Sequence, residues 1–256
     1  VDMISAKKFV LKSLDCDYLG NGYSNEVYSI GKSDTILRIM SPLMSSEKVE
    51  KVVADSVRQS IFGWILQKYT AIFKGFVVME YSNETEDNTH SNETEDNTLE
   101  LFVGQIIERI DIVVKATPYT SDEADAIVLQ MMEMVLDLNR EMLYYPDTTM
   151  YNIVMSKEGP KVLDFDHQVC KYESTDPKIS CDRDIKTFVP SYNDMQIQQI
   201  SSFLIVAIDM IRSNIGGRND LPFSESMTKL IGDIKKERMN DSALELAIKE
   251  YKIKQK

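Results

Sequence analysis

The feature that most constrains the fold is the hydrophobic pattern, which is mainly strand-like in the first third of the chain and helical in the rest. Residues 9–40 alternate between apolar and polar and predict three short strands, and residues 73–81 predict a buried fourth strand. Further on, apolar residues recur at helical spacing in four segments: 99–114, 121–143, 193–212 and 227–251. The chain therefore predicts an α+β fold in which a small β-rich part precedes a larger helical part.

One helix is also expected within the β-rich part. Residues 45–68 place valines and isoleucines at helical spacing after an N-cap signal at Ser45. Trp64 lies in the apolar end of this segment and is predicted to be a core residue. Three methionines of the segment 121–143 are predicted to fill the core of the helical part: Met131, Met132 and Met134.

A duplicated acidic segment separates the two parts. The octapeptide SNETEDNT occupies residues 82–89 and again residues 91–98, so that these 17 residues carry six acids and no base. A segment of this composition has too few apolar side chains to build a core, which predicts a solvated insertion. The expected organisation is an N-terminal lobe over residues 1–81, the insertion over 82–98, and a helical C-terminal lobe over 99–256.

The overall charge excludes several classes of function. The chain has 41 acidic and 29 basic residues and a net charge of −12, whereas a nucleic-acid binder needs a basic face. No apolar run approaches the ~20 residues that span a bilayer, and no signal-peptide pattern is found. The three cysteines, Cys16, Cys170 and Cys181, form no CxxC motif. We therefore expect a cytoplasmic, intracellular protein without a nucleic-acid or membrane partner.

Two groups of polar residues in the second half have the chemistry of phosphoryl transfer. Asp147 is followed five residues later by Asn152, and the sequence Asp164-Phe165-Asp166 ends a predicted strand twelve residues after that. Phosphoryl transfer needs a carboxylate to orient the acceptor hydroxyl, and an amide oxygen and a carboxylate to hold Mg²⁺. Either group alone is ordinary turn chemistry, but the order and spacing of both together favour a catalytic and metal-binding site.

A glycine-containing turn in the first half has a second possible function. Gly20 and Gly22 flank Asn21 between two predicted strands, and glycines there allow the backbone amides to approach a phosphate. A plain hairpin turn is the alternative interpretation. A dinucleotide-binding fingerprint is excluded, because a strand and not a helix follows the turn.

With these motifs the chain resembles the protein-kinase-like superfamily over most of its length. The resemblance rests on five segments in order: LGNGYSNEVY for the glycine-rich loop, TILRIM for the third strand, FVVMEY for the strand into the hinge, YPDTTMYNIVM for the catalytic loop and KVLDFDHQ for the magnesium-binding strand end. It implies a two-lobed fold with a five-stranded, antiparallel β-rich N-lobe, one N-lobe helix and a mainly helical C-lobe. The implied cofactors are ATP and Mg²⁺.

The resemblance also implies a role for individual residues. Asp147 matches the catalytic aspartate, and Asn152 and Asp164 match the magnesium ligands. Arg38 stands at the position of the lysine that pairs with the ATP phosphates, where its planar guanidinium keeps the charge. The nucleotide-binding set that the resemblance implies is Gly20, Asn21, Gly22, Asn25, Val27, Arg38 and Glu80.

Several positions depart from the family pattern. Tyr145-Pro146 replaces the usual His-Arg before the catalytic aspartate, and Thr149 replaces the lysine that serine/threonine kinases carry. No Ala-Pro-Glu sequence closes the activation segment. The acidic partner of Arg38 on the N-lobe helix stays open among three candidates: Glu47, Glu50 and Asp55.

The expected function is ATP- and Mg²⁺-dependent phosphorylation of serine or threonine in a protein substrate. Two alternatives remain: a pseudokinase that binds or inhibits a partner, and a small-molecule kinase of the aminoglycoside phosphotransferase or choline kinase type. Of the 66 positions from Tyr81 to Asp147, 17 belong to the acidic insertion, which leaves little chain to enclose a small acceptor and favours a protein acceptor. The minimal layout is similar in style to divergent kinases of large DNA viruses or bacterial effectors, for which the location would be the host cytoplasm.

Overall fold

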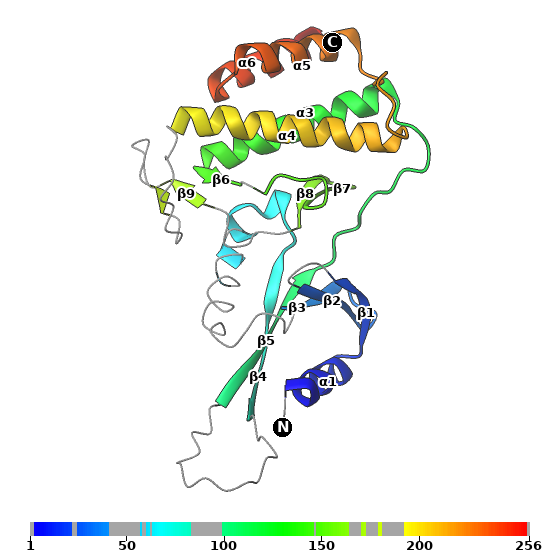
Figure 1. The fold of residues 1–256 in the computed structure, drawn as a ribbon, viewed down its shortest axis with the longest axis vertical. Coiled ribbons are helices and arrows are strands. Elements are labelled where there is room, and N and C mark those ends of the chain that lie inside the picture. The colour runs from blue at the N-terminus through cyan, green and yellow to red at the C-terminus, as the bar shows by residue number, and fades with distance from the viewer. Residues whose placement is uncertain are drawn as a thin grey trace, which may run out of the picture. The chain divides into compact units, whose positions relative to one another are not determined.

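The computed structural model describes residues 3–21, 25–40, 57, 60–61, 63–82, 99–145, 147–163, 170–172, 179–180 and 192–254. The chain divides into two compact units. Unit 1 comprises Val1–Gln67 and Ala71–Arg109, and unit 2 comprises Lys68–Thr70 and Ile110–Lys256. Figure 1 shows the helices and strands of both units, coloured along the chain.

Unit 1 is built on a five-stranded antiparallel sheet with the strand order β1-β2-β3-β5-β4. Its strands are β1 (Cys16–Asn21), β2 (Asn25–Ile30), β3 (Thr35–Met40), β4 (Phe73–Ser82) and β5 (Leu99–Glu108). The first three strands form a meander, and β5 then pairs with β3 on one side and with β4 on the other. This antiparallel sheet, together with the helices of unit 2, confirms the predicted α+β class.

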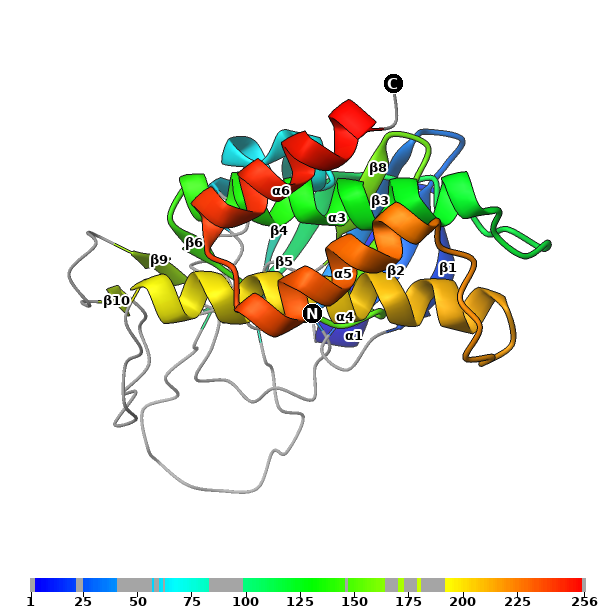
Figure 2. The ribbon, with the colours of Figure 1, turned by 90° about the horizontal axis from the view of Figure 1, so that it is seen from above.

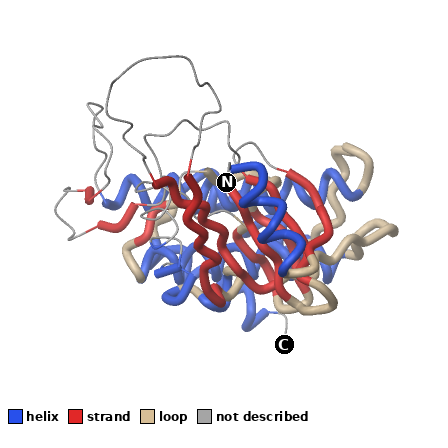
Figure 3. Tube along the Cα trace, turned by 90° about the horizontal axis from the view of Figure 1, so that it is seen from below, coloured by secondary structure: helices blue, strands red, loops and turns tan. Residues whose placement is uncertain are grey.

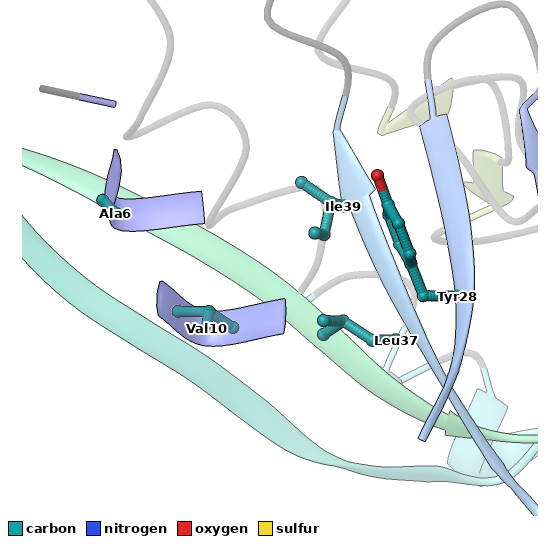
Figure 4. Close-up of a cluster of buried hydrophobic side chains, with 5 residues drawn as sticks. All are labelled: Ala6, Val10, Tyr28, Leu37 and Ile39. Carbon is teal, nitrogen blue, oxygen red and sulfur yellow. The ribbon is translucent and has the colours of Figure 1, made fainter. Parts of the chain in front are cut away.

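A short helix, α1 (Met3–Ser13), covers one face of the sheet, as Figure 3 shows from below. The sequence analysis assigned residues 9–13 to a strand, which is wrong, because Ala6 and Val10 lie one helical turn apart and are both buried. Side chains of a strand alternate between the two faces of a sheet, so every second residue of β3 faces this helix. Figure 4 shows the resulting core: Ala6, Val10, Tyr28, Leu37 and Ile39.

Polar contacts also tie α1 to the second strand. Lys7 forms an ion pair with Glu26 of β2, and the hydroxyl of Tyr28 donates a hydrogen bond to the same carboxylate at 2.7 Å. Partial burial disfavours the ionised carboxylate, but the two hydrogen bonds outweigh it and lower the pKa of Glu26. The helix is thus held on the sheet by an apolar core and by one shared acid.

Strand β5 contradicts the helix predicted over residues 99–114. The apolar residues of an inner strand follow one another with weak alternation, so that a run such as LELFV also fits helical spacing. Gly104 suits the strand, because a Cβ there would lie only 2.7 Å from Cδ1 of the buried Leu37. Residues 99–109 therefore belong to the sheet unit, and the division between the units falls after Arg109.

Unit 2 is organised around two long helices that lie side by side (Figure 2). They are α3 (Ser121–Arg140) and α4 (Tyr192–Asn214), and two shorter helices, α5 (Glu225–Glu237) and α6 (Asp241–Lys254), pack on them. Thr120 caps α3 in a capping box, in which its backbone N–H donates to Glu123 at 2.8 Å. The helices predicted from residues 121, 193 and 227 onward are thereby confirmed.

The core of unit 2 is larger and mostly aliphatic. Met131, Met132 and Met134 of α3 are completely buried, which confirms their predicted role as core residues. Phe203 of α4 is buried as well and packs edge-on against Tyr145, with the ring centroids 6.5 Å apart. This core supports the segment that follows α3, where the candidate catalytic residues lie.

Short strands line this segment of unit 2. A hairpin is formed by β7 (Ile153–Ser156) and β8 (Gly159–Val162), while β6 (Leu143–Tyr144), β9 (Cys170–Tyr172) and β10 (Ile179–Ser180) form a small sheet. The 3-10 helix η1 (Gln67–Tyr69) ends at Tyr69, whose hydroxyl donates to Asp137 of α3 at 2.5 Å. None of the described helices combines the length and apolar character that crossing a membrane requires.

The N-lobe helix expected over residues 45–68 lies mostly outside the described residues, as does all but Ser82 of the acidic insertion. The described end of that segment corrects the prediction for Trp64, which is 75% exposed. Among the described residues of this helical turn, Gly63 and Leu66, three residues apart, are buried, and Trp64 faces outward.

Candidate functional site

The candidate residues fall into two groups, one in each unit. Unit 1 carries the seven expected nucleotide-binding residues, and unit 2 carries Asp147, Asn152 and Asp164. Gly22 and Asp164 lie outside the described residues, and so do the three acids considered as partners of Arg38: Glu47, Glu50 and Asp55. For two further positions the backbone register alone is described: Asn25, which pairs with Met40, and Glu80, which pairs with Leu101.

Three residues of the sheet group lie in one row across the strands. Gly20 of β1 pairs with Val27 of β2, and Val27 pairs with Arg38 of β3. Residues directly opposite one another in a sheet share a face. Because the neighbours of Arg38 along β3, Leu37 and Ile39, belong to the core under α1, this row lies on the opposite face of the sheet.

The same row continues into β5 with a residue that the sequence analysis did not single out. Gln105 pairs with Arg38 and is only 7% exposed, so it is a buried polar side chain beside the candidate cation. The sequence analysis missed Gln105 because residues 99–114 were expected to form a helix. With the strand recognised, its pairing with β3 follows from the antiparallel register.

The end of β1 is fixed by a local side-chain contact. The hydroxyl of Tyr18 donates a hydrogen bond to the side-chain oxygen of Asn21 at 2.9 Å. The ring of Tyr18 packs edge-on against Tyr28, with the centroids 5.5 Å apart. A register shift between Tyr18 and Gly20 marks an irregularity in the β1–β2 ladder just before this turn. Asn21 is therefore held at the strand end by its own neighbours.

In unit 2 the structure brings Asp147 and Asn152 into direct contact. The side-chain amide of Asn152 donates to Oδ2 of Asp147 at 2.6 Å and to its backbone oxygen at 3.3 Å. The backbone N–H groups of Asn152 and Ile153 donate to the oxygen of Thr149, at 3.2 and 3.1 Å. These two bonds close the loop from Asp147 to Asn152. The five-residue spacing noted in the sequence is thus the span of one tight loop.

The β7–β8 hairpin ties this loop to the segment that leads to Asp164. Ile153 pairs with Val162, and both side chains are buried. One residue further out, the backbone N–H of Leu163 donates to the oxygen of Asn152 at 2.8 Å. The chain therefore passes beside Asn152 one residue before it reaches Asp164.

A buried glutamine of α4 holds the start of the loop. The side-chain oxygen of Gln199 accepts a hydrogen bond from the backbone N–H of Tyr145 at 2.6 Å, and Gln199 is only 1% exposed. Burial raises the pKa of the neighbouring Tyr144. Gln199 was missed in the sequence because it lies 54 residues from Tyr145; a polar residue on the buried face of an apolar helix is the signal that marks it.

The geometry of the loop allows two polar functions at once. A carboxamide is planar, so the nitrogen of Asn152 that binds Asp147 leaves its oxygen directed away from that carboxylate. An amide oxygen is a suitable ligand for Mg²⁺. The second oxygen of Asp147, Oδ1, is an additional acceptor that suits a hydroxyl group.

Within the described residues, no group of three or more histidine, cysteine, aspartate or glutamate side chains is arranged to hold a metal ion. Asp164 is not among the residues to which this finding applies. A scan of the chain against models of protein families found no match. A search of curated proteins likewise found no significant match.

Proposed function

We propose that this chain is a divergent protein-kinase-like enzyme that transfers the γ-phosphoryl group of ATP to a serine or threonine of a protein. The observation that carries the proposal is the loop of unit 2, in which Asn152 is hydrogen-bonded to Asp147 through its side chain and to Leu163 through its backbone. Leu163 directly precedes Asp164 in the sequence, so the described hydrogen bonds extend from Asp147 to within one residue of the third position with a matching role in the family.

Mg²⁺ fits the oxygen donors of this region. The amide oxygen of Asn152 and the carboxylate of Asp164 are the hard ligands that this ion prefers. When held there, Mg²⁺ would supply positive charge to offset the negative charge that develops during phosphoryl transfer. The Nδ2 group of Asn152 meanwhile keeps the carboxylate of Asp147 in one orientation, in which Oδ1 accepts the hydrogen bond of the incoming hydroxyl.

The row of residues in unit 1 supports a nucleotide-binding role. Gly20 offers a backbone without a Cβ, and Val27 offers an apolar surface for the base on the same face of the sheet. The guanidinium of Arg38 is suited to two phosphate oxygens at once. Arg38 also lies on β3, the strand on which protein kinases carry their phosphate-binding lysine.

The connection between the sheet and α3 favours a protein acceptor over a small molecule. In the described part of this region, residues 99–120, the chain passes from β5 to α3 without a helix. Small-molecule kinases of the aminoglycoside and choline type usually place additional helices here to build an acceptor pocket. A pseudokinase remains the alternative from another class, motivated by Tyr145-Pro146 and by Arg38.

The direct test measures the transfer of labelled γ-phosphate from ATP to a mixture of protein acceptors. Wild type is compared with Asp164→Ala, and with Asp220→Ala as a control for the loss of an acid in an exposed loop of unit 2. We expect Mg²⁺-dependent phosphoserine or phosphothreonine from wild type and from Asp220→Ala, and none from Asp164→Ala at an unchanged melting temperature. Full activity of Asp164→Ala would remove the metal assignment.

Two further outcomes would decide between the alternatives. Binding of ATP without transfer to any acceptor would favour the pseudokinase. Transfer to aminoglycosides or choline, but to no protein, would favour the small-molecule kinase. Failure of wild type to bind ATP at millimolar concentration would contradict both kinase interpretations.

A further inference from the structure

A chain of polar side chains, buried at Asn139 and Gln199 and half-buried at Asp241, connects α6 to the start of the candidate catalytic loop. At one end is Asp241, the first residue of α6, and its Oδ1 accepts a hydrogen bond from Nδ2 of Asn139 at 2.6 Å. The oxygen of Asn139 accepts from Nε2 of Gln199 at 2.7 Å, and Gln199 accepts from the backbone N–H of Tyr145. Asn139 and Gln199 are 4% and 1% exposed, so water does not substitute for these contacts.

In both amide side chains, Asn139 and Gln199, the oxygen accepts a hydrogen bond and the nitrogen donates one. The nitrogen of Gln199 donates a second hydrogen bond, to the backbone oxygen of Leu143 at 3.0 Å. The other oxygen of Asp241, Oδ2, accepts from Gln196 of α4 at 2.8 Å. A buried polar group left without its partner costs about 1–3 kcal/mol, so this arrangement is strongly favoured over any in which one contact is missing.

The carboxylate fixes the direction of Asn139, and this direction agrees with the one that the backbone groups of Leu143 and Tyr145 give to Gln199. An ionised carboxylate accepts hydrogen bonds but donates none, so Asn139 must turn its nitrogen toward Asp241. Its oxygen then faces Gln199, which must present its nitrogen, and the oxygen of Gln199 is left facing Tyr145. If Asn139 were reversed, its nitrogen would meet the nitrogen of Gln199, and the N–H of Tyr145 would lose its acceptor once Gln199 reversed in turn.

We propose that Asp241 is a positioning residue for the candidate loop, acting through Asn139 and Gln199. This inference rests on the proposed function, because Tyr145 lies two residues before Asp147. Asp241 touches no residue of the candidate site, and it lies 102 positions from Asn139 along the chain. Its function is to fix the orientation of Asn139, so that the oxygen of Asn139 stays available as an acceptor for Gln199, which in turn holds the backbone that leads to Asp147.

Two variants test the direction of the chain. Asp241→Asn keeps the shape of the side chain but leaves one oxygen for the two donors, Asn139 and Gln196. The double variant Asn139→Asp with Asp241→Asn exchanges the two groups. The carboxylate at position 139 then accepts from both neighbours, and Gln199 keeps its orientation toward Tyr145. A matched control is Asn240→Ala, which removes the bond from Ala243 to the side chain of Asn240 at the start of α6 and leaves the chain intact.

The first readout is amide hydrogen exchange of Tyr145 by NMR, relative to a core amide of α3 such as that of Val135. We expect Asp241→Asn to raise the relative exchange rate by about tenfold, the effect of one buried hydrogen bond. The double variant and Asn240→Ala should stay within about twofold of wild type. The second readout is phosphoryl transfer, for which Asp241→Asn should lower kcat and leave the KM for Mg-ATP unchanged.

The two readouts separate the two claims. Unchanged exchange of Tyr145 in Asp241→Asn would overturn the positioning role, whatever the activity. Failure of the double variant to restore exchange would also overturn it, because charge exchange preserves every hydrogen bond that the proposal invokes. A wild-type chain that transfers no phosphate overturns the proposed function instead, and the exchange rates still decide whether Asp241 orients Asn139.

Discussion

The two units hold their candidate residues by different means. In unit 1 the row formed by Gly20, Val27 and Arg38 is set by the backbone ladder of an antiparallel sheet, and the core on the other face of the sheet has five buried side chains among the described residues. In unit 2 Asp147 and Asn152 lie on a loop that is fixed by side-chain hydrogen bonds over a larger core. The register of a sheet is compatible with many different side chains. Hydrogen bonds between side chains, in contrast, depend on the identity of each residue that takes part. Substitutions in unit 2 should therefore change chemistry more sharply than those in unit 1.

The largest effect is expected for Asp147→Asn in unit 2. The new amide oxygen still accepts from Asn152, so the loop geometry is retained while the negative charge is lost. Loss of the carboxylate should reduce the rate of phosphoryl transfer by about 1000-fold, within the usual range for general-base groups. Initial rates and ATP affinity, measured on the same preparations, check this. An unchanged rate would show that the carboxylate takes no part in transfer.

Core substitutions should affect the two units separately. Leu37→Ala removes a completely buried side chain from unit 1 and should lower its free energy of unfolding by about 3 kcal/mol; Met132→Ala should do the same in unit 2. Amide hydrogen exchange in β2 and β3 follows unit 1, whereas circular dichroism at 222 nm follows mainly the helices of unit 2. A single transition shifted equally by both variants would contradict two separable units.

A smaller effect is expected at the start of α3. Thr120→Ala removes the capping-box hydroxyl and should destabilise unit 2 by about 1 kcal/mol. The control is Thr117→Ala, an exposed threonine in the same connection. The thermal midpoint by circular dichroism should fall for the first variant and not for the second. Equal midpoints for both variants would show that the cap does not contribute.

The smallest effect is a pH dependence at the same cap. Hydrogen bonds from Lys115 and Thr120 lower the pKa of Glu123 to about 2, from 4.5. A lowered pKa in the folded state means that the ionised carboxylate stabilises the fold above pH 4.5 and loses this effect as the pH falls toward 2. The difference in thermal midpoint between wild type and Glu123→Gln should therefore shrink between pH 5 and pH 2. Asp122→Asn, in the same helical turn, controls for the loss of an exposed acid, and a difference that stays constant would contradict the assignment.

The sequence predicted the parts of the fold in which local pattern and tertiary packing agree. The helices of unit 2 and the buried methionines follow from helical spacing alone. β5 does not, because a strand paired on both sides carries an apolar run that also fits a helix. The prediction that Trp64 is a core residue was wrong for a related reason. Apolar neighbours in the sequence indicate a helix that packs on a core, but they do not show which face of that helix is buried.

For the candidate site, the sequence predicted only contacts between residues that lie close together along the chain. The contact between Asp147 and Asn152 follows from a five-residue loop, and Leu163 follows from the hairpin. Gln199, Asn139 and Asp241 could not be found in this way, since their partners lie 54 to 102 residues away and meet only when the helices pack. The position of Gln105 beside Arg38 could be recognised only once the register between β3 and β5 was known.

The most direct test of the central claim is calorimetric titration with ATP, with and without Mg²⁺, on wild type, Arg38→Ala and Asn152→Ala. We predict that Mg²⁺ strengthens ATP binding to wild type. Arg38→Ala should weaken binding by about tenfold under both conditions, since it removes a phosphate contact from unit 1. Asn152→Ala should abolish the enhancement by Mg²⁺ and leave metal-free binding unchanged. An enhancement that survives in Asn152→Ala, or a wild type that binds no ATP, would contradict the account.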